Sequence, residues 1–306
     1  MFNKLHRLFK LFRILLINRA SIVYTSPVRS KVLTDIAPEK WEIHKFGLSE
    51  NNWRKLQGRS YWVTGAGTGY GQAIASSLAA AGAQVFLTGR RIEMLRESLR
   101  NMANLDIDSG NCHLIPADLT KYEDIRGACK TVAEMCDSLD GLINNAAIPS
   151  KPGSQYPLQD DPIEYWDKIM AINLKAPWLL TRTVFPHMRL NGVIRVIFMT
   201  SEAGWASTPG FGMYNVSKAG LNSLGHSMAM EYSKRFPDDD IQFNIVQPGE
   251  ARTEMNQGSS DSPFSVVSIV LRLLVQPKGS ANGKFFDRLG RHMQFCHTWP
   301  YERPLI

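Results

Sequence analysis

The sequence predicts an α/β fold built as one domain on a doubly wound parallel sheet. From residue 59 onward, short runs of β-branched and aromatic residues alternate with longer segments of helical character. Strands that alternate with helices in this way form a parallel sheet covered by helices on both faces. The chain has 306 residues, 44% of them apolar and 21% charged, which is enough to fill one large core. In such sheets, ligands bind beyond the carboxyl ends of the strands.

The alternating region is expected to extend over residues 58–290, with a C-terminal tail at 291–306. Strands are expected at 60–65, 83–89, 112–117, 141–146, 193–200, 241–246 and 283–287. Helices are expected near 70–82, 91–104, 121–136, 161–188, 212–235 and 263–275. Asp261 and Ser262 precede Pro263, which suits the start of the last helix.

Residues 1–57 are expected to form a basic amphipathic extension followed by a connector. Of the 35 Lys and Arg residues, seven lie in residues 1–31, which contain no Asp or Glu, and the other 28 balance the 28 acidic residues. On a helical wheel of residues 2–17, one side holds Leu5, Leu8, Phe9, Phe12, Leu15 and Leu16. The pattern fits a helix on a membrane surface, a mitochondrial targeting sequence, or a helix packed on the protein itself. Residues 20–57 show no clear period and are expected to be a connector.

The composition argues against two function classes. Because the body of the chain has no excess of basic residues, nucleic-acid binding is not expected. The four cysteines form no CxxC pair and the seven histidines are scattered, so no metal site is expected. Free thiols are typical of a reducing compartment. We therefore expect a cytoplasmic protein, with membrane association through residues 2–17 or a mitochondrial location as alternatives.

A glycine-rich turn follows the first expected strand. Residues 64–71 read TGAGTGYG and lead into a helix rich in small residues. Glycines let a phosphate approach the backbone, and the helix offers unpaired N–H groups and the positive end of its dipole. A tight turn without a ligand would look similar, but the position between a strand and a helix favours a nucleotide site.

The end of the second expected strand indicates which nucleotide. An NAD site commonly has Asp or Glu there to accept hydrogen bonds from the ribose. This chain has Arg90 and Arg91 instead, and a guanidinium group pairs well with a 2′-phosphate. The sequence favours NADP over NAD, with Arg90 as the phosphate ligand, unless both arginines are merely solvated. Asp118, after the third strand, is placed to accept from the adenine amino group or to cap the next helix.

Ser201, Tyr214 and Lys218 form a second constellation. Tyr214 and Lys218 lie four residues apart at the start of an expected helix, so their side chains share one face. A nearby ammonium group and an oxidised nicotinamide are expected to lower the pKa of Tyr214. The phenol would then exchange a proton with an alcohol and carbonyl pair. Ser201 ends the preceding strand, where its hydroxyl can hold the reacting oxygen.

In order and spacing, these motifs resemble the core oxidoreductase branch of the short-chain dehydrogenase/reductase family. The resemblance is close over residues 59–255 and looser over 256–290. It rests on TGAGTGYG, DLT at 118–120, NNAA at 144–147, Asn173 in MAINLKAP, Ser201, YNVSK at 214–218 and PGEART at 248–253. It implies a Rossmann-type fold.

The resemblance implies a catalytic tetrad of Asn173, Ser201, Tyr214 and Lys218. Tyr214 would be the acid/base, Ser201 would polarise the substrate carbonyl, and Lys218 would bind the nicotinamide ribose. Asn173 would hold a water in a proton relay. The expected cofactor-binding residues are Thr64, Gly65, Gly67, Thr68, Gly69, Tyr70, Gly71, Arg90, Asp118, Leu119, Asn145, Ala146, Ala147, Tyr214, Lys218, Pro248, Gly249 and Thr253.

Two features depart from the family pattern. Ala147 stands where the family usually has glycine, beside the cofactor. The glycine pair that usually follows the last strand is replaced by FDRLGRHMQF, and the segment between Thr253 and that strand is compact. The substrate lid and one customary oligomer surface are therefore expected to differ from the family.

The sequence thus predicts an NADP(H)-dependent oxidoreductase that interconverts a carbonyl and a secondary alcohol. The expected partners are a small carbonyl or alcohol substrate and further copies of the chain in a homodimer or homotetramer. Trp205, Phe211, Met255 and the loop at 149–161 are expected to border the substrate. Two alternatives are a non-catalytic cofactor-sensing or scaffold protein of the same fold and a nucleotide-sugar-modifying enzyme.

Overall fold

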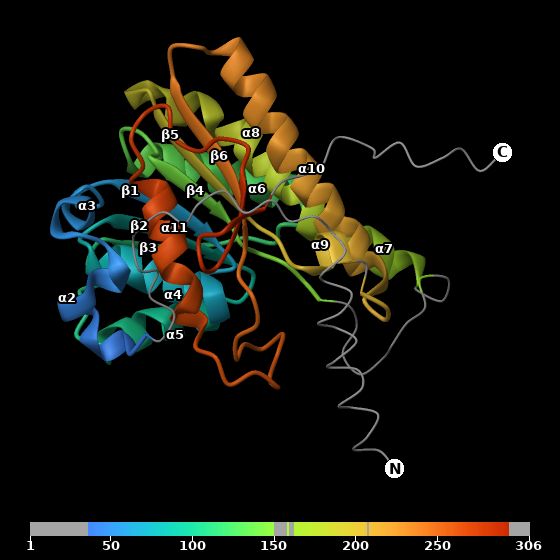
Figure 1. Cartoon of the computed structure of the whole chain (residues 1–306), viewed down its shortest axis with the longest axis horizontal. Helices are drawn as coiled ribbons and strands as arrows, with labels where there is room; N and C mark the ends of the chain where they lie inside the picture. The colour runs from blue at the N-terminus through green and yellow to red at the C-terminus, as the bar shows by residue number, and fades with distance from the viewer. Residues whose placement is uncertain (1–35, 150–157, 159–161, 207, 294–306) are drawn as a thin grey trace.

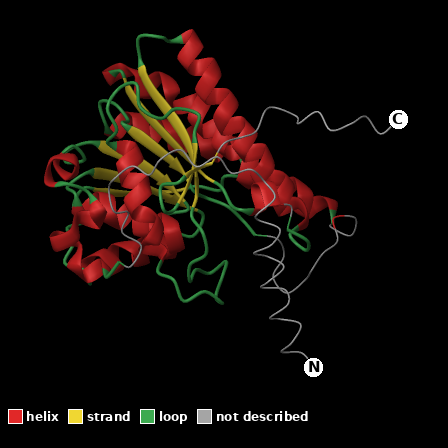
Figure 2. Cartoon of the chain, in the orientation of Figure 1, coloured by secondary structure: helices red, strands yellow, loops and turns green. Residues whose placement is uncertain are grey.

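A single twisted sheet lies at the centre of the protein (Figures 1 and 2). The computed structural model describes residues 36–149, 158, 162–206 and 208–293, and within them the sheet has eight strands in the order β3-β2-β1-β4-β5-β6-β7-β8. β1 to β7 are parallel, and β8 pairs antiparallel with β7. The strands are β1 (Ser60–Thr64), β2 (Gln84–Gly89), β3 (Cys112–Pro116), β4 (Gly141–Asn144), β5 (Val193–Met199), β6 (Asp240–Gln247), β7 (Phe285–Asp287) and β8 (His292–Met293). The expected strands and the expected doubly wound fold are confirmed.

Each face of the sheet packs on its own layer of helices (Figure 1). In β1, Tyr61 and Val63 belong to the core on one face and Trp62 to the core on the other, as the two-residue period of a strand requires. The first face packs on α4 (Gly69–Ala80), α5 (Ile92–Ala103) and α11 (Val267–Leu274). The second packs on α6 (Tyr122–Met135), α8 (Ala176–Met188) and α10 (Gly212–Arg235). Burial on both faces explains the nearly continuous apolar runs of the strands.

The long helix expected over residues 161–188 is interrupted. α7 (Ile163–Met170) and α8 are joined by a π-helical turn, η4 (Ala171–Lys175). Its N–H groups bond to carbonyls five residues earlier, as Ala176 does to Ala171, and such turns are frequent at functional sites. Asn173 lies in this turn and is only 1% exposed. Two shorter helices, η5 (Arg189–Asn191) and α9 (Ala203–Ala206), lie in the connections around β5.

The described part of the expected connector is folded onto the domain. Phe46 is fully buried and stacks on Phe264 of η6 (Pro263–Val266), with ring centroids 5.8 Å apart. A guanidinium N–H of Arg272 on α11 donates to the main-chain carbonyl of Gly47. Because each helix here is so short, no period shows in the sequence. The helices between residues 36 and 57 are η1 (Pro38–Lys40), α2 (Trp41–His44), η2 (Lys45–Gly47) and α3 (Glu50–Arg54). The expected domain boundary at residue 57 stays a prediction.

A tight turn follows β7 and returns the chain as β8. The Oδ1 atom of Asp287 accepts hydrogen bonds from the main-chain N–H groups of Leu289 at 2.9 Å and Arg291 at 2.8 Å. Gly290 has a φ of 73°, which favours glycine. Two residues are too few to read as a strand in the sequence, so β8 was not expected. The start of the expected C-terminal tail therefore belongs to the sheet.

Some expectations concern residues outside the described ranges. These are the helix at 2–17, most of the loop at 149–161, Cys296 and the tail beyond residue 293. Cys112, Cys129 and Cys136 are free thiols. No helix in the described part of the chain is both long and apolar enough to cross a bilayer. The described residues also contain no group of three or more His, Cys, Asp or Glu side chains that could hold a metal ion.

Candidate active site

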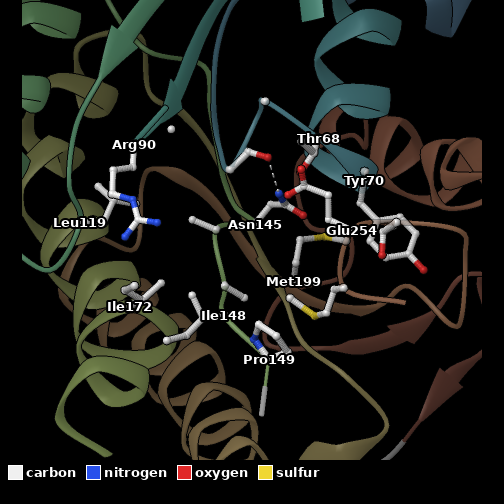
Figure 3. Close-up of a pocket in the computed structure, with 18 of the residues that line it drawn as sticks. Thr68, Tyr70, Arg90, Leu119, Asn145, Ile148, Pro149, Ile172, Met199 and Glu254 are labelled. Carbon is white, nitrogen blue, oxygen red and sulfur yellow. Dashed lines mark hydrogen bonds between the residues drawn. The ribbon is translucent and has the colours of Figure 1, made fainter. Parts of the chain in front are cut away.

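A cleft with a volume of about 480 Å³ opens where the parallel strands end (Figure 3). Most of its lining residues lie at or just after the ends of β1 to β6, at the edge of the sheet where doubly wound folds bind ligands. Thr64, Gly71, Asn173, Ser201 and Gly249 were predicted as site residues and do not line it. The predicted residues that line it are Gly65, Gly67, Thr68, Gly69, Tyr70, Arg90, Asp118, Leu119, Asn145, Ala146, Ala147, Tyr214, Lys218, Pro248 and Thr253.

The glycine turn after β1 has no room for a Cβ atom at its glycine positions. A Cβ atom on Gly71 would lie 2.2 Å from the carbonyl oxygen of Gly65, and one on Gly65 would lie 2.9 Å from the Cα atom of Ala146. Gly65 and Gly69 have φ values of 65° and 56°, which favour glycine. Thr68, the N-cap of α4, makes no side-chain hydrogen bond to the first turn of the helix. The N–H groups of that turn are thus available to an anionic group.

Thr64 and Asn145 hold the glycine turn against the end of β4. The Thr64 hydroxyl accepts hydrogen bonds from the main-chain N–H groups of Asn145 and Ala146, both at 3.0 Å. The Nδ2 atom of Asn145 donates to the carbonyls of Thr64 at 2.9 Å and Gly65 at 3.3 Å (Figure 3). Asn145 lines the cleft itself, whereas Thr64 supports its wall from behind and therefore need not line it.

Arg90 lies beside Leu119, on the opposite side of the cleft from Tyr70 (Figure 3). Among the described residues no carboxylate forms an ion pair with Arg90, so its guanidinium group is open to a ligand. Asp118 accepts hydrogen bonds from the N–H group of Thr120 at 3.0 Å and from its hydroxyl at 2.8 Å. Burial raises the pKa of Asp118, but the Thr120 hydrogen bonds and the charges of Lys121 and Arg90 outweigh it and hold the pKa below its ordinary value.

The second arginine of the pair is used within the protein. A guanidinium nitrogen of Arg91 lies 2.7 Å from a carboxylate oxygen of Glu254; both residues line the cleft, and both side chains are about half exposed. This ion pair engages Arg91 and leaves Arg90, the predicted phosphate ligand, without a carboxylate partner among the described residues.

Ser201, Tyr214 and Lys218 meet at the end of β5. Tyr214 and Lys218 lie one turn apart on α10 and are 7% and 2% exposed. The phenol of Tyr214 and the hydroxyl of Ser201 form a hydrogen bond. The Nζ atom of Lys218 donates to the main-chain carbonyl of Met199 at 2.9 Å. The predicted hydroxyl, phenol and amine are thus brought together.

The pKa of Tyr214 differs from the sequence-based expectation. Burial raises it from 10.0 to about 12, and the hydrogen bond with Ser201 lowers it by less. Burial also lowers the pKa of Lys218 from 10.5 to about 7, so this amine is only partly charged at neutral pH. The expected lowering of the Tyr214 pKa is therefore wrong for the protein alone, because the cost of burying the charged phenolate exceeds the effect of the hydrogen bond with Ser201.

Asn173 acts on the cleft through the main chain of Ile148. Its Oδ1 atom accepts from the Ile148 N–H group at 2.9 Å, and its Nδ2 atom donates to the Ile148 carbonyl at 3.0 Å and to the Ser217 hydroxyl at 3.1 Å. Ile148 lines the cleft. The π-helical turn thus aims an amide side chain at the strand end, where it fixes the backbone after NNAA.

Sequence reasoning missed several lining residues that carry no distinctive chemistry. Trp205 and Phe211, which were expected to border the substrate, do not line the cleft, and the ring of Trp205 packs on Phe285 with centroids 4.4 Å apart. Met255 does line it, as expected. The signal that could have identified the missed residues is their place just after a strand or in the helix that follows. Pro149, the first residue of the loop expected to border the substrate, does line the cleft, and the missed residues are Gly89, Met94, Ala117, Ile148, Ile172, Met199, Thr200 and Glu254.

Comparisons with known proteins agree with this geometry. The chain matches the family described as short chain dehydrogenase over residues 60–263. It is 31% identical over 225 residues to dehydrogenase/reductase SDR family member 4 of Bos taurus, covering 73% of this chain and 76% of that protein. It is 31% identical over 219 residues to the 2-(R)-hydroxypropyl-CoM dehydrogenase of Xanthobacter autotrophicus, covering 72% and 85%. The crystal structure of a metagenomic short-chain oxidoreductase in complex with NADP is 30% identical, with a TM-score of 0.63 over 74% of this chain and 95% of that one.

The fold and the site define a nucleotide-binding oxidoreductase of the Rossmann type. The chain belongs to the short-chain dehydrogenase family, whose members are NAD(P)-dependent oxidoreductases that act on alcohols and carbonyls.

Proposed function

We propose that the protein is an NADP(H)-dependent oxidoreductase that interconverts a carbonyl and a secondary alcohol. The observation that carries the proposal is the hydrogen-bonded pair of Ser201 and Tyr214, beside buried Lys218, in a cleft whose other side holds Arg90. The relative from Xanthobacter autotrophicus is named for a 2-hydroxypropyl substrate, which is a secondary alcohol. The metagenomic relative of known structure binds NADP.

The described residues fit a dinucleotide along the length of the cleft. The glycine turn and the first turn of α4 would hold the pyrophosphate, because the main-chain N–H groups of that helical turn are available to an anionic group. Arg90 would pair with the 2′-phosphate, which supports NADP over NAD. Asp118 has one carboxylate oxygen left for the adenine amino group, since the other is bound by Thr120. Lys218 would contact the nicotinamide ribose, and Pro248 and Thr253 would lie at the nicotinamide.

The protein's side chains would bind the reacting oxygen of the substrate and transfer its proton. When bound, the nicotinamide supplies a hydride to the carbonyl carbon or takes one from the alcohol carbon. Tyr214 keeps its proton at neutral pH, since burial raises its pKa to about 12, so it can donate that proton to the carbonyl oxygen. The Ser201 hydroxyl would hold the same oxygen. A positive charge on Lys218 would stabilise the phenolate that remains, and Asn173 would keep the wall at Ile148 in place beside a relay water.

The proposal is tested by turnover of the purified protein. NADPH oxidation would be followed with ketones, aldehydes and keto-sugars, and NADP reduction with the matching alcohols. We expect turnover with at least one pair, and a loss of about a hundredfold or more in Tyr214→Phe, since general acid–base catalysis contributes about 10²–10⁴-fold. Tyr122→Phe, on the exposed side of α6, is the matched control and should keep full activity.

Two results would contradict the proposal. Full activity in Tyr214→Phe would remove the acid/base role. Tight NADPH binding without turnover of any carbonyl would instead favour a cofactor-sensing protein of the same fold.

A further inference from the structure

Tyr70 links two parts of the cleft that are far apart in the sequence. It lies in the first turn of α4, lines the cleft, and is half-buried. Its hydroxyl donates a hydrogen bond of 3.0 Å to the main-chain carbonyl of Gly249, in the turn that follows β6. Burial raises the pKa of Tyr70 well above its ordinary value, so the hydroxyl remains a donor over the whole physiological pH range.

Arg288 contacts the same turn but, unlike Tyr70, does not line the cleft. Gly249 has a φ of 74°, and a Cβ atom built on it would lie 2.9 Å from the Cδ atom of Arg288. The glycine therefore lets the arginine stem pack directly on the backbone that Tyr70 holds from the cleft side. Arg288 comes from the turn between β7 and β8, in the segment that departs from the family pattern.

The guanidinium group of Arg288 ties together both ends of the loop between β6 and η6. Its Nη1 atom donates to the Glu250 carbonyl at 3.0 Å and lies 2.7 Å from a carboxylate oxygen of Asp261. The main-chain carbonyl of Asp261 in turn accepts from the N–H group of Arg252 at 2.8 Å. Between these ends lie Thr253, Glu254 and Met255, which line the cleft.

We propose that Tyr70 and Arg288 are a pair of positioning residues that brace the loop at 249–261 from its inner and outer sides and so fix Thr253 at the cleft. The inference rests on the proposed function for the identity of the ligand, but the brace itself is a property of the protein alone. It also gives a role to the unusual segment after β7, which supplies the outer anchor in place of the family's glycine pair.

Hydrogen exchange tests the brace without any cofactor or substrate. The main-chain N–H groups of Arg252, Thr253 and Asn256 are hydrogen-bonded within the loop, so their exchange reports its opening. We expect Tyr70→Phe and Arg288→Gln each to speed exchange of these groups about fivefold, the factor that one net hydrogen bond implies. The rest of the sheet should exchange as in the wild type.

The control variants remove similar groups that do not touch the loop. Tyr122→Phe removes an exposed phenol on α6, and Arg291→Gln removes a second arginine of the β7–β8 turn, which pairs with Asp287. Neither should change exchange at residues 252–256. Arg288→Lys keeps the charge opposite Asp261 and should restore part of the protection.

A double variant tests whether the two residues act on the same loop. If they brace it together, Tyr70→Phe should speed exchange of the loop less in the Arg288→Gln background than in the wild type. The Arg288→Gln loop already opens more readily, so removal of the second contact changes its opening less. Equal effects in both backgrounds, unchanged exchange in the loop, or faster exchange throughout the protein would each overturn the brace.

Cofactor measurements then connect the brace to the reaction. Because Arg90 and the glycine turn would hold the rest of the dinucleotide, NADPH affinity measured by fluorescence should change less than twofold in Tyr70→Phe, while the rate of a single reductive turnover falls about fivefold. A lower affinity with an unchanged rate would contradict the positioning role. A wild-type protein with no turnover at all would count against the proposed function and would leave the exchange result standing.

Discussion

The Nζ atom of Lys218 lies 5.6 Å from the centre of the Tyr214 ring, and both side chains are buried in the wall of the cleft. Burial lowers the pKa of Lys218 from 10.5 to about 7, so the folded protein gives up this proton before the unfolded chain does. Between about pH 7 and 10.5 the unfolded chain therefore binds more protons, and the free energy of unfolding should rise with pH.

Lys218 should raise the free energy of unfolding by up to about 1.4 kcal/mol per pH unit in this window. Urea unfolding of the wild type and of Lys218→Met, which keeps an apolar stem, would measure it at several pH values. The free energy of unfolding of the wild type minus that of Lys218→Met should increase as the pH rises from 7. A difference that is constant with pH would show that Lys218 keeps its ordinary pKa.

Replacement of Arg90 should discriminate between the two dinucleotides. A charge-assisted hydrogen bond contributes about 1.5–3 kcal/mol, so Arg90→Ala should weaken NADPH about 10-fold to 150-fold and NADH hardly at all. Arg91→Ala is the natural comparison, because Arg91 is engaged with Glu254. Affinities from quenching of protein fluorescence would settle the matter, and equal losses for both dinucleotides would exclude Arg90 as the phosphate ligand.

The close packing of the glycine turn can be tested by comparing Gly71 with Gly127, a glycine on α6 that has open space around it among the described residues. Gly71→Ala places a Cβ atom 2.2 Å from the carbonyl oxygen of Gly65, so it should cost about 1–3 kcal/mol of stability and weaken NADPH binding. Gly127 is exposed on α6, and a Cβ atom there would meet no packing neighbour within 4 Å among the described residues, so Gly127→Ala should stabilise the protein by up to about 1 kcal/mol. Thermal unfolding with and without NADPH would compare them, and similar behaviour of the two variants would refute the close packing.

The short helices before β1 should contribute to the stability of the whole domain. Phe46 is fully buried against Phe264, whereas Ile43, three residues earlier, is 83% exposed. Phe46→Ala should lower the free energy of unfolding by about 3–5 kcal/mol, and Ile43→Ala should change it by less than about 0.5 kcal/mol. Denaturant titration would measure the free energy of unfolding of both variants. A change of less than about 1 kcal/mol in Phe46→Ala would show that this segment does not contribute to the stability of the domain.

The amphipathic pattern of residues 2–17 remains a prediction from sequence. If this segment binds lipid, its deletion should abolish co-sedimentation with vesicles that contain anionic lipid, because the basic side chains would no longer attract the surface. The same deletion should leave NADPH affinity unchanged. Sedimentation that persists without these residues would rule out the membrane interpretation and favour the targeting or packed-helix alternative.

The strands and most helices could be predicted because burial on both faces imposes a continuous apolar pattern with β-branched residues at each strand. The two-residue strand β8 and the short helices at 38–54 could not, since none is long enough to show a period. The interruption at residues 171–175 was also invisible, because the residues of a π-helical turn fit an α-helical pattern on either side.

In the site, the residues with distinctive chemistry were predictable, and the surroundings that tune them were not. Ser201, Tyr214 and Lys218 meet as their spacing implied, but the pKa of Tyr214 depends on burial, which a linear motif does not record. Likewise, the sequence could not show that Arg91 is engaged in an ion pair, since only the fold brings Glu254 to it. Arg288 had no signal beyond its place in a segment that departs from the family.

The π-helical turn also sets the orientation of the helix before it. Successive residues of an α-helix are about 100° apart around its axis, so removing one residue from 171–175 would make the helix regular and rotate all of α7 by about that angle relative to α8. Tyr165, whose hydroxyl donates to the Pro149 carbonyl, would then point elsewhere. A single-residue deletion at this place would therefore disconnect α7 from the strand end that it supports while leaving the helical content unchanged.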